Sequence, residues 1–418
     1  MSGNNLLIRP AEEVRSPVNY AHSGYKASDK DAATRLRLAI VHDYLLQMGG
    51  AERVVAAMAQ AFPDAPIYTS ATDYGGMLPE FLGKKIRNTW MQSLPGIRQH
   101  FKKFLPIYPF AFRSLSPVKA DVVWISSSGF AKGVRVADSS KTICYCHTPP
   151  RFFWDFDLYL NGEIRNSFVR ESAKTALFLL REWDFDCAQR IDRFIANSRC
   201  VQERIWRCYR RPSAVIHPPV NVDRFSVSSR SGDYHVVLSR LVGYKRIDLA
   251  VHAFNRLRKK LVIIGDGPDR ARLESLAGPT VSFLGTVGDA EVKTYLEGCQ
   301  GLIFPGLEDF GIAPVEAQAA GKPVIAFAGG GALETVEPEV TGVLFPEQTV
   351  GALVEAVLQS QRIDWCPETI RANVLRFSRE TFVEKTRVLI RAVDQEPRRR
   401  KVDRASEVIK PISESYGL

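Results

Sequence analysis

Short apolar runs alternate with helical patterns along most of the chain. In the first half, runs typical of buried strands occur at Leu36–Val41, Ile67–Ser70, Val122–Ser126, Thr142–Cys146, Phe194–Asn197 and Ala214–Ile216. The pattern restarts in the second half, at Tyr234–Leu238, Leu261–Ile264, Val281–Leu284, Leu302–Phe304 and Val324–Ala326. Amphipathic segments such as Ala51–Phe62 and Asn166–Arg190 lie between the runs. This alternation of strand and helix predicts an α/β fold with two parallel sheets.

A polar stretch of small residues separates the two halves. The stretch Ser226–Asp233 reads SVSSRSGD and has the composition of a linker. The predicted parts are a flexible leader (1–35), an N-terminal Rossmann-like domain (36–225), the linker (226–232), a C-terminal Rossmann-like domain (233–380), a C-terminal helix (381–395) and a basic tail (396–418). We expect the two domains to face each other across a cleft and a ligand to bind in that cleft.

The composition is ordinary for a soluble globular protein, with 45% hydrophobic and 24% charged residues among 418. Seven cysteines without metal-type spacing predict buried thiols in a reducing, cytoplasmic setting. Because no apolar segment reaches the ~18 residues of a membrane span, we expect a protein that is neither exported nor integral to a membrane. The formal charge of +10 suits anionic lipid, nucleic acid or a phosphorylated substrate.

The stretch Gly306–Gly321, GLEDFGIAPVEAQAAG, follows the predicted strand Leu302–Phe304 and enters a helix. The backbone N–H groups of Gly311, Ile312 and Ala313 near the helix start suit an anion. Two carboxylates beside them suit sugar hydroxyls, since each carboxylate accepts several hydrogen bonds. These carboxylates belong to Glu308 and Glu316, and Phe310 lies between them in the sequence. The pattern predicts a sugar-nucleotide site, and the alternative is two surface glutamates beside an ordinary strand–helix turn.

Two further segments lie at predicted strand ends of the second half. Arg240 and Lys245 follow the strand Tyr234–Leu238, where open α/β sheets bind ligands, and they suit a diphosphate. A solvated basic loop is the alternative. Gly265 and Gly267 flank Asp266 at the next strand end, where paired glycines allow close backbone approach to a base or ribose. The third glycine of a dinucleotide fingerprint is absent, so this segment alone is weak evidence.

The first half offers two similar features. Gly49 and Gly50 form a turn between the first strand and the helix Ala51–Phe62, as in the first unit of a Rossmann-like domain. His147 ends the strand Thr142–Cys146, where it could bond a sugar hydroxyl or pyrophosphate. A structural histidine is the alternative.

Two Asp-x-Asp sequences resemble the metal-binding motif of some sugar transferases. They are Asp155-Phe156-Asp157 and Asp184-Phe185-Asp186, and neither follows a convincing buried strand. The second falls within a predicted helix, where residues two apart face different sides. We therefore interpret both as structural, and we expect no metal and no cofactor because Arg240 and Lys245 can neutralise a diphosphate.

The segment Ile97–Phe112 interleaves aromatic and basic residues. Pro106 and Pro109 break any long helix in it. Lys102 and Lys103 could meet anionic lipid headgroups while Phe101, Phe104 and Leu105 enter the bilayer interface. The alternative is a core segment with two solvated lysines.

Together these motifs resemble those of the retaining glycosyltransferases of family 4, which have the GT-B fold, over about Leu36–Asp394. The resemblance implies that Glu316 binds the nucleotide ribose, that Glu308 reaches the transferred sugar, and that Arg240 and Lys245 hold the diphosphate. It further implies that His147 and the Gly49–Gly50 backbone contact the sugar-phosphate region. The stretch HTPPRFFWD is most similar to bacterial mannosyltransferases of polysaccharide and O-antigen assembly.

The resemblance implies transfer of a hexose, with GDP-mannose the favoured donor, to a lipid-linked saccharide acceptor at the cytoplasmic face of the inner membrane. Catalytic roles are expected for His147, Arg240, Lys245 and Glu308. Donor binding is expected at Gly49, Gly50, Gly265, Gly267, Phe310, Gly311, Ile312, Ala313 and Glu316. Another UDP- or GDP-sugar such as UDP-glucose, or a sugar-nucleotide epimerase of similar fold, is the alternative. Nucleic acid is not an expected partner, because the cations form no continuous stripe with stacking aromatics.

Overall fold

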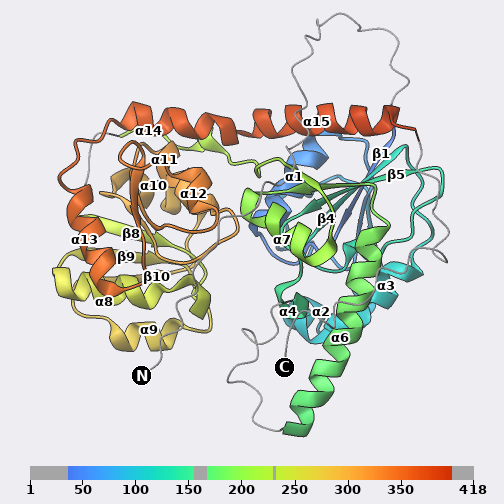
Figure 1. The fold of residues 1–418 in the computed structure, drawn as a ribbon, viewed down its shortest axis with the longest axis horizontal. Helices are drawn as coiled ribbons and strands as arrows, with labels where there is room; N and C mark the ends of the chain where they lie inside the picture. The colour runs from blue at the N-terminus through green and yellow to red at the C-terminus, as the bar shows by residue number, and fades with distance from the viewer. Residues whose placement is uncertain (1–35, 155–166, 229–231, 398–418) are drawn as a thin grey trace, which may run out of the picture. The chain divides into compact units, whose positions relative to one another are not determined.

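The computed structural model describes residues 36–154, 167–228 and 232–397. It contains two sheets in which every strand pair is parallel. The first sheet has the order β3-β2-β1-β4-β5-β6-β7 and the second has the order β10-β9-β8-β11-β12-β13. Figure 1 labels β1, β4 and β5 of the first sheet and β8, β9 and β10 of the second. In each sheet the strand order reverses once, between β1 and β4 and between β8 and β11. Ligands of open α/β sheets bind at such reversals.

The strands of the first sheet are β1 (Leu38–His42), β2 (Ile67–Thr69), β3 (Ile86–Asn88), β4 (Val122–Ser127), β5 (Lys141–Cys146), β6 (Arg193–Ala196) and β7 (Ser213–Val215). The α-helices between and after them are α1 (Gly50–Ala61), α2 (Ile97–His100), α3 (Tyr108–Ser114), α4 (Arg151–Trp154), α6 (Ser167–Gln189) and α7 (Arg199–Tyr209). Short 3₁₀ segments are η1 (Pro79–Phe81), η2 (Trp90–Ser93), η3 (Phe101–Ile107) and η4 (Ala131–Gly133).

The strands of the second sheet are β8 (Tyr234–Leu238), β9 (Lys260–Ile264), β10 (Val281–Gly285), β11 (Leu302–Phe304), β12 (Val324–Phe327) and β13 (Gly342–Phe345). The helices are α8 (Ile247–Leu257), α9 (Arg270–Leu276), α10 (Asp289–Gly298), α11 (Ile312–Ala319), α12 (Ala332–Thr335), α13 (Val350–Ser360), α14 (Pro367–Val374) and α15 (Arg379–Gln395). The 3₁₀ segments are η5 (Val222–Arg224), η6 (Gly243–Lys245) and η7 (Leu375–Phe377).

Both faces of each sheet are buried, which explains why the strands read as continuous apolar runs. In the second sheet, Val236 packs with α10 and α11, while the next residue, Val237, packs with α8 and α13 on the other face. Side chains of successive strand residues point to opposite faces, so Val236 and Val237 belong to two separate core clusters. The prediction of an α/β fold with two Rossmann-like sheets is confirmed.

Two strands, β3 and β13, were not predicted. The edge strand β3 reads Ile-Arg-Asn and none of its residues is fully buried. The strand β13 begins with Gly342, whose missing side chain lets it pair closely with Val324. A Cβ on Gly342 would lie 2.0 Å from the backbone oxygen of Val324. Any other residue at this position would clash with β12, although a glycine weakens the sequence signal for a strand.

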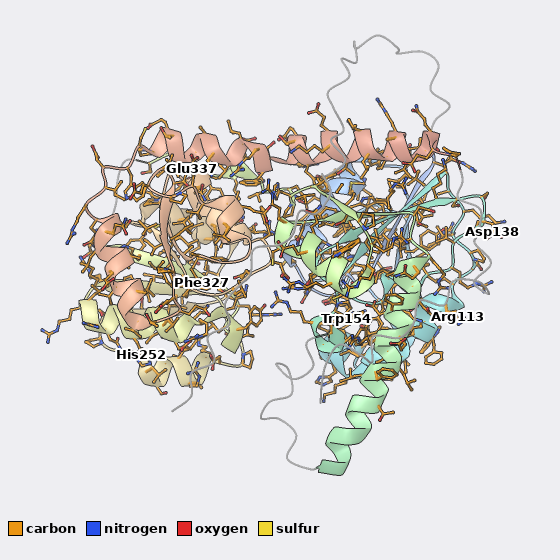
Figure 2. All side chains as sticks on the ribbon, viewed as in Figure 1. Arg113, Asp138, Trp154, His252, Phe327 and Glu337 are labelled. Carbon is orange, nitrogen blue, oxygen red and sulfur yellow. The ribbon has the colours of Figure 1, made fainter. Side chains whose placement is uncertain are left out.

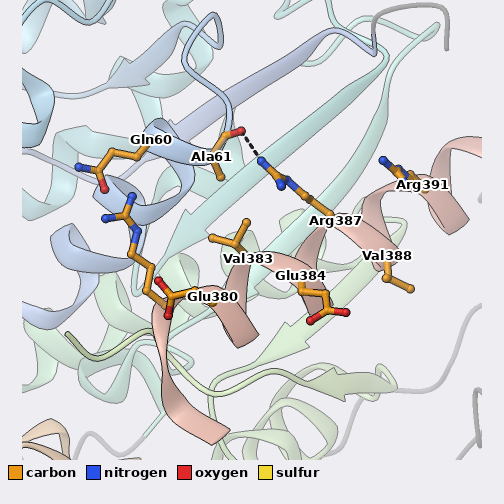
Figure 3. Close-up of a pocket in the computed structure, with 9 residues that line it drawn as sticks. Gln60, Ala61, Glu380, Val383, Glu384, Arg387, Val388 and Arg391 are labelled. Atoms are coloured by element: carbon orange, nitrogen blue, oxygen red, sulfur yellow. Dashed lines mark hydrogen bonds between the residues drawn. The ribbon is translucent and has the colours of Figure 1, made fainter. Parts of the chain in front are cut away.

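The last helix, α15, packs against the first sheet although it follows the second in the chain. Phe382 contacts Tyr145 of β5 edge to face, with ring centroids 5.8 Å apart. The Arg387 guanidinium donates to the backbone oxygen of Ala61 at 3.1 Å (Figure 3). The pocket in Figure 3 lies between α15 and the end of α1, and none of the residues predicted to bind a donor lines it.

The segment Ile97–Phe112 folds as α2, η3 and most of α3, which agrees with the expected interruption by proline. Its apolar side chains mostly pack inward. Phe101, Phe104 and Leu105 are partly buried against the core of the first sheet, so only part of each side chain is available to a bilayer. Phe110 is 68% exposed and points away from that core. No helix in the described ranges is long and apolar enough to cross a membrane.

The second Asp-x-Asp sequence is structural, as predicted. Asp184 of α6 is fully buried, 3.0 Å from the Nζ atom of the equally buried Lys132. Its carboxylate also accepts from the indole N–H of Trp154 (labelled in Figure 2) at 3.0 Å and from the Tyr209 hydroxyl at 2.7 Å. The ion pair and these two hydrogen bonds together join η4, α4, α6 and α7. The first sequence, Asp155-Phe156-Asp157, lies outside the described residues.

We expect Lys132→Met to lower the free energy of unfolding by about 3–5 kcal/mol, because it leaves the Asp184 carboxylate buried without its cation. Urea denaturation measures this loss. The matched control is Lys260→Met, which removes an ion pair to Asp233 whose side chains are 63% and 71% exposed. That change should cost less than about 1 kcal/mol. Equal losses in the two variants would contradict the structural role of Lys132.

Candidate functional site

The strand ends at the reversal of the second sheet bring the predicted cations and carboxylates together. Lys245, in η6 after β8, forms an ion pair with Glu308, which follows β11. Only 14% of the lysine side chain and 18% of the glutamate side chain are exposed, so the pair is shielded from solvent. Arg240 lies in the same loop as Lys245 and is exposed. A lysine and an arginine beside a carboxylate can bind a phosphate and a hydroxyl group at neighbouring points.

Glycines pack against the backbones of these loops and fix where the loops run. A Cβ on Gly265 would lie 2.0 Å from the backbone oxygen of Ser239, and one on Gly267 would lie 2.2 Å from that of Leu241. These two contacts enclose Arg240. Gly306 approaches Lys245 in the same way, since its Cβ would lie 2.8 Å from the Lys245 Cα atom. The close approach predicted for the paired glycines is therefore made to the chain's own backbone.

The loop that carries Glu308 is fixed by a second glycine pair that was not predicted. A Cβ on Gly330 would lie 2.1 Å from the backbone oxygen of Glu308, and one on Gly331 would lie 2.2 Å from the Phe310 Cα atom. The Gly331 N–H also donates to the Glu308 backbone oxygen at 2.9 Å. The triplet of glycines after β12 was a visible signal in the sequence, but its partner could not be identified without the fold.

Helix α11 begins where the prediction placed an anion site. Gly311 precedes its first residue with φ +86, a value that other residues rarely adopt, and Ile312 and Ala313 form its first turn. The first N–H groups of a helix have no partner inside the helix, so they can bind an anion. The Phe310 ring, in contrast, is buried against His217 and Phe377. Its side chain supports the loop and is not presented to a ligand.

Glu316 lies on α11 in a network of charges. Its carboxylate is 3.4 Å from the Arg224 guanidinium, which also lies 3.0 Å from the Asp289 carboxylate. Arg53 of α1 reaches the same aspartate at 3.4 Å. Burial raises the pKa of Glu316, and the positive charge of Arg224 opposes this shift. Hydroxyl groups of a ligand that donate hydrogen bonds to this buried carboxylate would stabilise its charged form.

The first sheet contributes the glycine turn and the predicted histidine. Gly49 precedes α1, and its N–H donates to the Glu52 carboxylate at 3.0 Å. Gly50 lies beside Ile312, since a Cβ on it would be 2.8 Å from the Ile312 Cδ1 atom. His147 follows β5, and its Nε2 atom is 2.7 Å from the Ser126 hydroxyl. Burial of its ring, followed by repulsion from His42, lowers the pKa of His147 to about 3. The ring is therefore neutral at physiological pH.

Asp309, next to Glu308, was not predicted, yet it receives two arginines from the first half. Arg151 donates to its carboxylate at 2.7 Å and Arg204 at 2.5 Å. Arg204 also donates to the Thr148 hydroxyl at 2.7 Å. The loop with Glu308 is thus tied to the segment that follows His147. A single aspartate in a motif gives no sign of partners 105 and 158 residues away.

Among the described residues, no three His, Cys, Asp or Glu side chains converge as metal ligands. The predicted site residues instead form two groups. Gly265, Gly267, Arg240, Lys245, Glu308, Gly311, Ile312, Ala313 and Glu316 belong to the second sheet, and Gly49, Gly50 and His147 belong to the first. Gly50 and Ile312 bring the two groups into contact. Asp309 and its arginines join the same parts of the chain.

Two family descriptions match adjoining parts of the chain. "Glycosyltransferase Family 4" matches residues 48–224 and "Glycosyl transferases group 1" matches residues 222–362. Together they span well over half of the sequence, and their junction falls at η5.

Individual relatives are distant. The alpha-1,3/1,6-mannosyltransferase ALG2 of Dictyostelium discoideum is 23% identical over 383 residues, which cover 74% of this chain and 86% of the relative. The uncharacterized glycosyltransferase MJ1178 of Methanocaldococcus jannaschii is 26% identical over 212 residues, 49% of this chain and 60% of the relative. Among solved structures, Anabaena HepE in complex with UDP-glucose superimposes with a TM-score of 0.62 at 18% identity, over 85% of this chain and all of that one.

The glycine contacts generate a prediction for the loop that carries Arg240. We expect Gly265→Ala to lower the free energy of unfolding by more than about 1 kcal/mol, because φ is +127 and the added Cβ meets the Ser239 backbone. Urea denaturation measures the change. The control is Gly351→Ala in α13, where an added Cβ meets nothing within 4 Å. That variant should gain up to about 1 kcal/mol of stability. An unchanged midpoint for Gly265→Ala would show that the loop tolerates displacement.

Proposed function

Because the chain has both domains of a GT-B glycosyltransferase of the family 4 type, we propose that it transfers a hexose from a nucleoside diphosphate sugar to a lipid-linked saccharide acceptor with retention of configuration. We favour mannose from GDP-mannose as the donor and bacterial polysaccharide assembly as the setting. The observation that carries this proposal is the shielded pairing of Lys245 with Glu308 beside the start of α11. In this arrangement Lys245 and the start of α11 would bind a diphosphate, and Glu308 would bind the sugar beside it.

In the proposed complex, Lys245, Arg240 and the first N–H groups of α11 bind the diphosphate. Glu308, released in part from Lys245, accepts hydrogen bonds from the sugar hydroxyls, and Glu316 accepts them from the ribose. The bond from the anomeric carbon to the diphosphate oxygen breaks while the acceptor oxygen bonds to the same face of the sugar. The acceptor proton passes to the leaving phosphate. Fixed cations stabilise the charge that develops on this phosphate, so preorganisation of the loop is the main catalytic device.

Two features of the chain support transfer without a divalent metal. Arg240 and Lys245 already supply positive charge where the diphosphate would lie. The Asp184 carboxylate, in contrast, already pairs with Lys132 and accepts hydrogen bonds from Trp154 and Tyr209. We therefore propose that turnover persists in excess chelator.

The donor and the role of Glu316 can be tested together. Saturation-transfer NMR should detect GDP-mannose more strongly than UDP-glucose, and labelled mannose should appear in a lipid-extractable product in excess chelator.

Glu316→Ala should weaken GDP binding by about 1.5–3 kcal/mol in calorimetric titration, because a charged hydrogen-bond acceptor for the ribose is lost. Glu355→Ala, which removes an exposed helical glutamate from α13, is the control.

Several outcomes would overturn parts of this proposal. Equal GDP affinity in the two glutamate variants removes Glu316 from the site. Stronger signals from UDP-glucose replace the donor but keep the reaction class. Conversion of the free sugar nucleotide without any acceptor would favour an epimerase. Loss of turnover in chelator that magnesium restores would make Asp155 and Asp157 the first residues to study.

We further propose that the protein binds the cytoplasmic face of the inner membrane through the surface of α2, η3 and α3. Lys103 and Phe110 are exposed on this surface, where a basic and an aromatic group suit an anionic bilayer. The inward packing of Phe101 and Phe104 reduces the apolar contribution to such binding, so electrostatic attraction would dominate.

We expect replacement of Lys102 and Lys103 by glutamate to reduce binding to anionic vesicles, by about 1 kcal/mol for each cation removed. Sedimentation with vesicles at two salt concentrations measures this, since added salt weakens such attraction. Replacing Arg256 and Arg258 by glutamate makes the same charge change on the exposed end of α8 and serves as the control. If both double variants lose binding equally, net charge governs attachment rather than this surface. If the Lys102 and Lys103 variant keeps its vesicle binding, the attachment site lies elsewhere and the arginine-rich segment Arg398–Lys401 is the next candidate.

A further inference from the structure

A chain of buried polar side chains joins three neighbouring strand ends of the first sheet. His42 ends β1, Ser126 lies near the end of β4 and His147 follows β5. The Ser126 hydroxyl lies 2.7 Å from the Nε2 atom of His147 and 3.1 Å from the Nδ1 atom of His42. His42 and Ser126 are almost completely buried, at 2% and 0% exposure. Buried polar groups are costly unless each makes its hydrogen bonds, so the direction of each bond in this chain matters.

The backbone determines the direction of these bonds. The Nδ1 atom of His42 is also 3.1 Å from the backbone oxygen of Ser126, which can only accept. His42 therefore carries a proton on Nδ1 and donates it toward Ser126. The Ser126 hydroxyl has a single proton, and with His42 donating toward it, that proton is free to go to the Nε2 atom of His147. As an acceptor, this Nε2 atom has no proton, so the proton of the neutral His147 ring lies on Nδ1.

Charges around the two rings agree with this direction. Burial opposes protonation of His42, but Glu52, whose Oε1 atom lies 3.9 Å from its Nε2 atom, and Asp43 outweigh that effect and raise the pKa of His42. His147, in contrast, has its pKa lowered to about 3 by burial and by His42. The surroundings thus favour protonation of His42 and oppose protonation of His147.

We propose that Ser126 and His42 are positioning residues that hold His147 in the tautomer with its proton on Nδ1 and so present that N–H to the donor sugar or its phosphate. The Nδ1 atom of His147 has no hydrogen-bond partner in the described part of the chain, whereas its backbone is held on both sides. The backbone N–H of His147 donates to the Ser127 backbone oxygen at 3.0 Å, and the His147 backbone oxygen accepts from the Asn197 side-chain amide at 2.9 Å. The ring is fixed in place with one donor left for a ligand.

The same chain reaches the glycine turn. Glu52 faces His42 with one carboxylate oxygen and accepts the Gly49 N–H with the other, at 3.0 Å. Two parts of the predicted donor site, the Gly49–Gly50 turn and His147, are therefore linked through the interior of the first sheet. This inference rests on the proposed function only in its last step, the identity of the ligand that receives the Nδ1 proton.

The tautomer can be tested without any substrate. In protein labelled with ¹⁵N-histidine, NMR should show the neutral Nδ1–H form of His147 in the wild type and in Ser126→Thr, which keeps the hydroxyl. Ser126→Ala should introduce the Nε2–H form, because it removes the proton donated to Nε2. The control is Ser127→Ala, which removes an equally buried hydroxyl one residue along β4 that faces Asp43 and Gly129 instead.

Turnover provides the second measurement. Ser126→Ala should lower kcat about tenfold, while Ser126→Thr and Ser127→Ala stay within about twofold of the wild type. A wild-type His147 in the Nε2–H form, or Ser126→Ala without a change of tautomer, overturns the inference. Equal kcat losses in Ser126→Ala and Ser127→Ala would mean a structural role alone. If the tautomer changes as expected but no sugar transfer is found with any donor, the proposed function fails and the positioning of His147 stands.

Discussion

The candidate site depends on close packing between glycines and the backbones of neighbouring loops. Arg240, Lys245 and Glu308 come from loops that would be free to move if only their side chains held them. Gly265, Gly306 and Gly330 instead bring backbone against backbone, at distances that no other residue permits. Rigid backbone is what allows fixed charges to stabilise a developing charge without rearrangement. The apolar strands beneath supply the platform, and the glycines determine where the loops leave it.

The charges of the two halves are balanced in pairs that a ligand can rearrange. Lys245 holds Glu308, and Arg224 holds Glu316, so each predicted ligand-binding carboxylate already has a cation. A bound diphosphate would compete for the lysine, and sugar hydroxyls would compete for the carboxylates. Because the groups are shielded, each exchange has a larger effect on free energy than it would in water. The buried pair Lys132–Asp184 differs, since its other polar contacts come from the protein and no ligand is needed.

Much of the fold followed from local pattern, while the supporting contacts did not. Strands β8 and β11 were predicted with their observed bounds, because buried parallel strands have continuous apolar runs. The motif from Gly306 to Gly321 likewise indicated a helix start and two carboxylates. The partners of Asp309 and the link from Ser126 to His147 connect residues separated by 21 to 158 positions. Such contacts have no periodicity, so only the sheet order brings them together.

The two sheets use their strand ends in different ways. In the second sheet the loops beyond β8 and β11 hold charged groups, which suit a diphosphate. In the first sheet the ends of β1, β4 and β5 hold His42, Ser126 and His147 in one hydrogen-bonded chain, which suits orientation of a single neutral donor. Both sets lie at the reversal of strand order, where neighbouring loops diverge and leave room for a ligand. A charged group binds strongly over a range of geometries, whereas a neutral N–H is selective only if its direction is fixed. The interior chain from Glu52 to His147 provides that direction.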